Sequence, residues 1–180
     1  GTQGYSAQPA TLGYAYLTIA TLKGQANVLG AGGTGYVNAG ESNSNAGTYE
    51  QRLNRLPVDT DTKLLILQGG PNDLKRTSGD YGAVVSRTIG LAKRKFPSAT
   101  VVVVGPAPSQ VGAVSGLLPI SRTIWTAATA NGAYYVSPID LSWINAGNIS
   151  SIIDTATGHP STAGHALIAE DLGAALGKLA

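Results

Sequence analysis

The chain has 180 residues, of which 43% are hydrophobic and only 12% are charged, and its formal net charge is +2. This balance excludes an intrinsically disordered chain, and so small a net charge gives no sign of a nucleic-acid partner. The absence of cysteine excludes a disulfide framework, thiolate zinc sites and a cysteine nucleophile. No apolar run approaches the roughly 20 residues of a membrane span.

Helices and strands are predicted to alternate along the chain. Helical spacing of apolar residues, closed by Lys, Gly or Pro, predicts helices at residues 12–23, 48–56, 80–96, 121–130 and 162–179. Short apolar runs that end in loop residues predict strands at 25–29, 63–68, 100–104 and 133–136. The alternation predicts a single α/β domain over residues 1–180 with a mostly parallel sheet.

The start of the chain is unusual for such a fold, because a helix comes first and no strand precedes it. The sequence also contains no methionine and begins with Gly1. We therefore expect a processed or trimmed piece of a longer chain. The composition, rich in small residues and poor in charge, fits a secreted or cell-surface protein.

Chemistry-bearing residues gather where the predicted strands end, which is where open parallel sheets bind ligands. Asn72 offers two N–H donors, and His159 offers a proton carrier near neutral pH. Acyl transfer needs both, because a base activates the hydroxyl nucleophile and N–H groups stabilise the oxyanion. The segments concerned are GAGGTG (30–35), GGPND (69–73), GPAPS (105–109) and DTATGHP (154–160).

Three of these motifs, in this order, resemble the SGNH, or GDSL-type, hydrolases over about the whole chain. They are Gly-Gly-Thr-Gly at 32–35, Gly-Pro-Asn-Asp at 70–73 and His-Pro at 159–160. The resemblance implies a flavodoxin-like three-layer α/β/α sandwich with five parallel strands. It also implies ester hydrolysis by a serine nucleophile, without metal or organic cofactor. The implied substrates are small esters, lipids or acylated carbohydrates.

The resemblance assigns roles to individual residues. Gly33 matches the glycine whose backbone N–H faces the oxyanion, and Gly32 is the neighbouring alternative. Asn72 matches the asparagine of the oxyanion hole, and His159 matches the histidine that takes the proton from the nucleophile. Asp73 is expected to hold its loop together by accepting backbone N–H groups.

The acid of the catalytic triad departs from the family pattern, which places it three residues before the histidine. That position is Ala156 here, and the nearest carboxylate is Asp154. Asp154 reaches His159 only if the intervening loop bulges. Otherwise a backbone carbonyl or a water orients the imidazole.

The nucleophile block of the family, Gly-Asp-Ser, does not occur in the 180 residues. Gly1 fits the end of a Gly-Asp-Ser-x-Thr-x-Gly turn, so we expect an N-terminal segment outside this chain to carry the first strand and the serine. Ser6 is the nearest serine, but five residues leave no room for a full strand before it. An empty strand position would expose unpaired backbone groups and favour aggregation, dimerisation or a rearranged element.

Other motifs favour ordinary structural roles. His165 follows His159 by six residues, which is not the spacing of two zinc ligands on one helix face. The G-x-G-x-x-G at 30–35 lacks the helix and the acidic residue of a dinucleotide site. A second function stays open, namely a non-catalytic SGNH-like module that binds carbohydrate or a surface, because the serine is absent and Ala156 replaces the acid.

Overall fold

The computed structural model describes residues 4–40, 46–75, 79–110 and 113–179. They form two compact units. The first unit comprises Gly1–Ala31, Pro108–Ala113 and Ser142–Ala180, and the second comprises Gly32–Ala107 and Val114–Leu141. The single domain expected over residues 1–180 stays a prediction.

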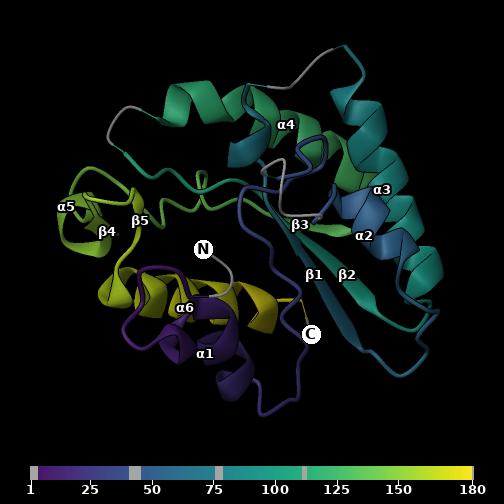
Figure 1. The fold of residues 1–180 in the computed structure, drawn as a ribbon, viewed down its shortest axis with the longest axis horizontal. Coiled ribbons are helices and arrows are strands. Elements are labelled where there is room, and N and C mark those ends of the chain that lie inside the picture. Colours follow the sequence, from purple (N-terminus) through teal and green to yellow (C-terminus); the bar gives the residue numbers. More distant parts are fainter. Residues whose placement is uncertain (1–3, 41–45, 76–78, 111–112, 180) are drawn as a thin grey trace. The chain divides into compact units, whose positions relative to one another are not determined.

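The second unit is built on a parallel sheet of three strands in the order β1-β2-β3. The strands are β1 (Leu64–Gln68), β2 (Thr100–Val104) and β3 (Tyr134–Val136). Leu64 pairs with Thr100, and Val102 pairs with Tyr134. The alternation of strands and helices seen in the sequence thus forms a parallel α/β fold, as predicted (Figure 1).

Three helices accompany this sheet, namely α2 (Tyr49–Asn54), α3 (Tyr81–Lys95) and α4 (Val114–Ala130). Buried side chains of all three pack with alternate residues of β1 and β2 into one hydrophobic core. β2 is buried from Val101 to Val104, as its unbroken run of valines indicates. The core side chains below 1% exposure are Val85, Ile89, Ala92, Val103, Ile124 and Ala128.

The first unit contains the two ends of the chain. Its elements are a 3₁₀ turn (Ala10–Leu12), α1 (Tyr14–Thr21), α5 (Ile149–Ile152), β4 (Ile153–Asp154), β5 (His159–Pro160) and α6 (Thr162–Gly177). β4 and β5 form a short antiparallel pair. No helix in the described part of the chain is long and apolar enough to cross a membrane.

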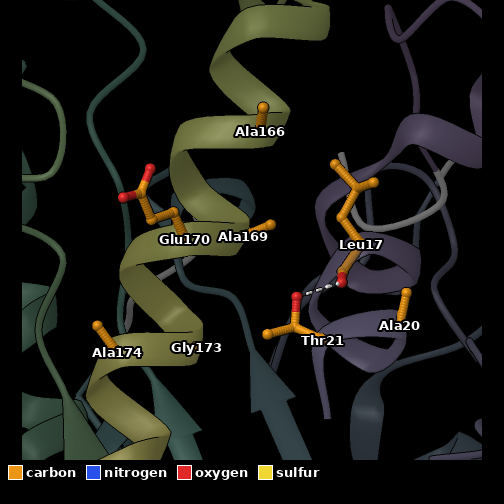
Figure 2. A pocket seen from close by; sticks show the side chains of 8 residues that line it. All are labelled: Leu17, Ala20, Thr21, Ala166, Ala169, Glu170, Gly173 and Ala174. Carbon is orange, nitrogen blue, oxygen red and sulfur yellow. Dashed lines mark hydrogen bonds between the residues drawn. The ribbon is translucent and has the colours of Figure 1, made fainter. Parts of the chain in front are cut away.

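Helices α1 and α6 of the first unit lie beside a groove of about 520 Å³ (Figure 2). Its lining is mostly small and apolar, with Glu170 as its charged member: Leu17, Ala20, Thr21, Ala166, Ala169, Glu170, Gly173 and Ala174. None of the predicted site residues lines this groove.

Several predicted elements need correction. Residues 25–29 form no strand, and most of them are exposed rather than packed on a neighbouring strand. The first helix begins at Tyr14 instead of residue 12, because Gly13 is extended where its backbone meets Gly4. α4 begins at Val114 rather than residue 121, and Pro119 lies inside it. The β4–β5 pair was not predicted, because two-residue strands leave no periodic signal.

Candidate active site

Gly33 and Asn72 lie together in the second unit. Asn72 belongs to a single 3₁₀ turn (Pro71–Asp73) that follows β1. Its Nδ2 donates to the backbone carbonyl of Thr34 at 2.9 Å. Both Gly33 and Asn72 are exposed, and Gly33 has a φ of +69°, a backbone conformation that glycine adopts without strain.

The orientation of the Asn72 carboxamide is fixed by this hydrogen bond. A primary amide has two N–H groups, so donation to Thr34 leaves a second N–H that can point to a ligand. The backbone carbonyl of Asn72 in turn accepts from the side chain of Asn38 at 2.9 Å. The two loops that carry the predicted oxyanion-hole residues are therefore joined by reciprocal hydrogen bonds.

The Asp73 carboxylate holds these loops together by accepting backbone N–H groups, as the sequence predicted. Its carboxylate accepts from the backbone N–H groups of Tyr36, Val37 and Asn38 at 2.9, 3.1 and 3.0 Å. The hydroxyl of Tyr81 donates to the same carboxylate at 3.2 Å, and Asp73 has no exposed surface. Burial first, and then the Asp73 charge, raise the pKa of Tyr81, so its phenol stays a donor.

Sequence reasoning missed the residues that buttress this loop. Arg52 of α2 donates to the Thr34 hydroxyl at 3.3 Å, and burial lowers the pKa of its guanidinium. Tyr49 donates to the carbonyl of Gln68, at the end of β1, at 2.6 Å. Both side chains lie on α2.

Asp154 and His159 lie together in the first unit, at opposite positions of the β4–β5 pair. Directly opposed residues of an antiparallel pair carry their side chains on the same face, about 5 Å apart at Cβ. The connecting turn contains Gly158 at a φ of +67°, and the N–H of Gly158 donates to the Asp154 carbonyl at 2.8 Å. The turn thus leaves Asp154 and His159 at paired backbone positions, and Asp154 as the acid that orients His159 stays a prediction.

The Asp154 carboxylate is held by its own turn. It accepts from the Thr157 hydroxyl at 2.9 Å and from the Ala156 N–H at 3.0 Å. The Thr157 hydroxyl is the main reason that the pKa of Asp154 is lowered, so this carboxyl is charged near neutral pH. Burial lowers the pKa of His159, and the Asp154 charge acts in the opposite direction.

The N-terminal segment adds two contacts to this pair. The ring of Tyr5 meets the imidazole of His159 edge-on, with centroids 4.8 Å apart. Ser6 Oγ lies 2.9 Å from the hydroxyl of Thr157, which itself donates to Asp154. Neither contact could be predicted, because more than 150 residues separate the partners.

The four predicted site residues are thus found as two pairs, one in each unit. Gly33 and Asn72 lie in the second unit, and Asp154 and His159 lie in the first. The roles of the first pair as oxyanion donors and of the second as acid and base stay predictions. The meeting of the two pairs at one point stays a prediction. Within the described ranges, no group of three or more His, Cys, Asp or Glu side chains lies close enough to hold a metal.

Several solved structures share the fold of this chain. A family two carbohydrate esterase from Clostridium thermocellum, solved with cellohexaose, has a TM-score of 0.61 at 20% identity, over 94% of this chain and 55% of that one. An active-site mutant of a family two carbohydrate esterase from the same organism has a TM-score of 0.64 at 19% identity, over 93% and 53%. Another crystal structure gives 0.73 at 15% identity, over 94% and 87%. The fold is that of SGNH esterases.

The chain belongs to the GDSL-like lipase/acylhydrolase family, whose model matches residues 1–167. A GDSL lipase of Mycobacterium tuberculosis is 27% identical over 150 residues, which are 82% of this chain and 62% of that protein. The chain therefore spans less than two thirds of the length of this relative. The family resemblance read from the three motifs is confirmed.

Proposed function

We propose that this chain supplies the oxyanion hole and the acid–base pair of a serine ester hydrolase. Gly33 N–H and the Asn72 carboxamide stabilise the oxyanion, and His159 carries the proton. Asp154 faces His159 and favours its protonated form. The serine comes from a segment outside these 180 residues, since no Gly-Asp-Ser occurs among them.

The observation that carries the proposal is the fixed carboxamide of Asn72, bonded to Thr34 on the loop that contains Gly33. An oxyanion hole works because its donors are oriented before charge develops, so no reorganisation is needed during the reaction. Here the Asp73 carboxylate fixes the neighbouring loop by accepting three backbone N–H groups. Family membership over residues 1–167 supports the same chemistry.

In the proposed reaction, His159 takes the proton from the serine hydroxyl as the oxygen attacks the ester carbonyl. The tetrahedral oxyanion accepts hydrogen bonds from Gly33 and Asn72. His159 then gives its proton to the leaving alcohol, and a water repeats the sequence to release the acid. The lowered pKa of His159 keeps its imidazole unprotonated, and so able to act as the base, at neutral pH.

The substrate class is a small ester, a lipid or an acylated carbohydrate. The structural neighbours named above are carbohydrate esterases, which favours testing acetylated sugars first. Acetylated oligosaccharides, p-nitrophenyl acetate and p-nitrophenyl palmitate separate the three classes in one assay.

The test uses the chain preceded by a strand that carries Gly-Asp-Ser, with p-nitrophenyl acetate as substrate. We expect Asn72→Ala to lower kcat about 10²- to 10³-fold, as the loss of one oxyanion donor does elsewhere. His159→Gln should abolish turnover. Asn54→Ala, at an exposed position on α2, is the matched control and should be neutral.

A folded, serine-bearing protein that hydrolyses none of these esters would refute the enzyme proposal. If that protein instead binds glycans without turnover, the chain is a binding module of the same fold. Mass spectrometry of the native material tests separately whether a short second peptide carries the first strand.

A further inference from the structure

His165 is the buried histidine of α6, and both of its ring nitrogens contact backbone. Its side chain has no exposed surface. Nδ1 accepts from the backbone N–H of Tyr14 at 3.1 Å, and Nε2 lies 3.0 Å from the carbonyl of Tyr5. A carbonyl only accepts, so Nε2 carries the hydrogen and Nδ1 carries none. The contacts therefore select one neutral tautomer.

The bond to Tyr14 caps a helix. Tyr14 is the first residue of α1, and the N-cap residue Gly13 offers no side chain to the orphan N–H groups. The imidazole of His165 takes this role from a distant helix, and its ring stacks on Tyr14 with centroids 5.8 Å apart and planes 14° apart. This half of the His165 contacts stabilises the α1–α6 pair.

The hydrogen bond from His165 Nε2 to the Tyr5 carbonyl holds the N-terminal turn. Residues 4–7 form a tight turn closed by the Ala7 N–H on the Gly4 carbonyl at 2.9 Å. Ser6 occupies this turn at a φ of +68°, a left-handed conformation that costs a non-glycine residue free energy. Such a turn persists where neighbouring residues hold it in place. Here the Tyr5 carbonyl accepts from His165 Nε2, and the Ser6 hydroxyl bonds to the Thr157 hydroxyl.

The Tyr5 residue thus joins two histidines. Its carbonyl is held by His165, and its ring lies edge-on against His159. Tyr5 is also 59% exposed as a residue, so the turn rather than burial in a core sets its position. We propose that His165 is a positioning residue for His159, acting through the Tyr5 ring. This inference rests on the proposed function, in which His159 is the proton carrier.

The test separates the two halves of the His165 contacts by substitution. His165→Asn keeps an acceptor near the position of Nδ1 and loses the donor to the Tyr5 carbonyl. Gln at 165 places a donor near the position of Nε2 and loses the acceptor for Tyr14. Tyr5→Leu removes the ring from His159, and Tyr5→Phe keeps it.

The readout is the titration of His159 by NMR, which is unambiguous because the chain has only two histidines. His165→Asn and Tyr5→Leu should uncover His159 and raise its midpoint toward the ordinary 6.5, since burial is the largest cause that lowers its pKa. His165→Gln and Tyr5→Phe should keep the wild-type midpoint. In the serine-bearing protein, Tyr5→Leu should lower kcat about two- to tenfold at unchanged KM.

An unchanged His159 midpoint in Tyr5→Leu would overturn the proposal, and so would a Nδ1–H or charged His165 in the wild-type protein at pH 7. If His165→Asn fails to fold, the tautomer of His165 in the wild-type protein and the substitutions at the exposed residue Tyr5 still test the proposal. The NMR readout needs no ester turnover. An inert protein whose His159 responds as expected therefore refutes the hydrolase and leaves the positioning contact standing.

Discussion

At the scale of single residues, Asp73 shows how one buried carboxylate organises a loop. It accepts three consecutive backbone N–H groups and the Tyr81 hydroxyl without any exposed surface. Gly35 allows this approach, because a Cβ at that position would lie 2.3 Å from the carboxylate. Oriented backbone N–H groups thus face the Asp73 carboxylate, and among the described residues no cation forms an ion pair with it.

Replacing this carboxylate by an amide is expected to be costly. Asp73→Asn places an NH₂ group among N–H donors and leaves some of them unpaired, so the free energy of unfolding should fall by about 3 kcal/mol. Urea denaturation measures this change. Asp61→Asn, at an exposed position before β1, is the matched control and should change stability by less than about 0.5 kcal/mol. Equal effects of the two substitutions would contradict the role assigned to Asp73.

At the scale of elements, two glycines of α6 differ in the atoms that surround them, and these atoms determine whether a larger residue fits. Gly164 lies in the first turn, where an added Cβ would come within 2.0 Å of the Ile152 carbonyl oxygen. Gly173 lies farther along the same helix, and no atom lies within 4 Å of the corresponding position. The first glycine permits the close packing of α6 on the α5–β4 junction, whereas the second only weakens the helix.

The same substitution should therefore have opposite signs at the two positions. Gly173→Ala is expected to raise the free energy of unfolding by about 0.5–1 kcal/mol, because alanine loses less backbone entropy in a helix. Gly164→Ala should lower it by about 3 kcal/mol or more, since backbone has to move. Thermal unfolding followed by circular dichroism compares the two variants. A neutral Gly164→Ala would show that the α6 N-terminus packs more loosely than described.

At the scale of the whole molecule, the edge of the parallel sheet leads to a prediction about behaviour in solution. β1 is an edge strand of the described sheet, and its sequence, Leu-Leu-Ile-Leu-Gln, has no charge to discourage pairing. Edges of this kind are templates for another strand.

We therefore expect the isolated 180-residue chain to associate through β1. Sedimentation equilibrium should show a concentration-dependent mass above that of the monomer. Ile66→Lys, which places a charge in the middle of β1, should reduce the association. Lys substituted at Val58, an exposed position outside the strand, is the control. A chain that stays monomeric at high micromolar concentration would contradict this expectation.

The elements that the sequence predicted well are those whose signal is local. The valines of β2 give its bounds residue for residue. The helix expected at 48–56 forms as α2 (Tyr49–Asn54), and a capping box of Thr48 and Gln51 starts it. Residues 25–29 look equally strand-like but form no strand, because a strand needs a partner that periodicity cannot supply. The first two turns of α4 were not predicted, because Pro119 lies within them and proline breaks helices in most contexts.

The sequence alone determined the family and the parallel α/β order, because short motifs and the alternation of apolar runs carry that information. It also predicted Gly33, Asn72, Asp154 and His159 as site residues. Only the tertiary structure decided how each pair is held. The fixed amide of Asn72 and the neutral tautomer of His165 depend on contacts with residues distant in sequence. Such contacts form only when the chain folds, so no local pattern records them.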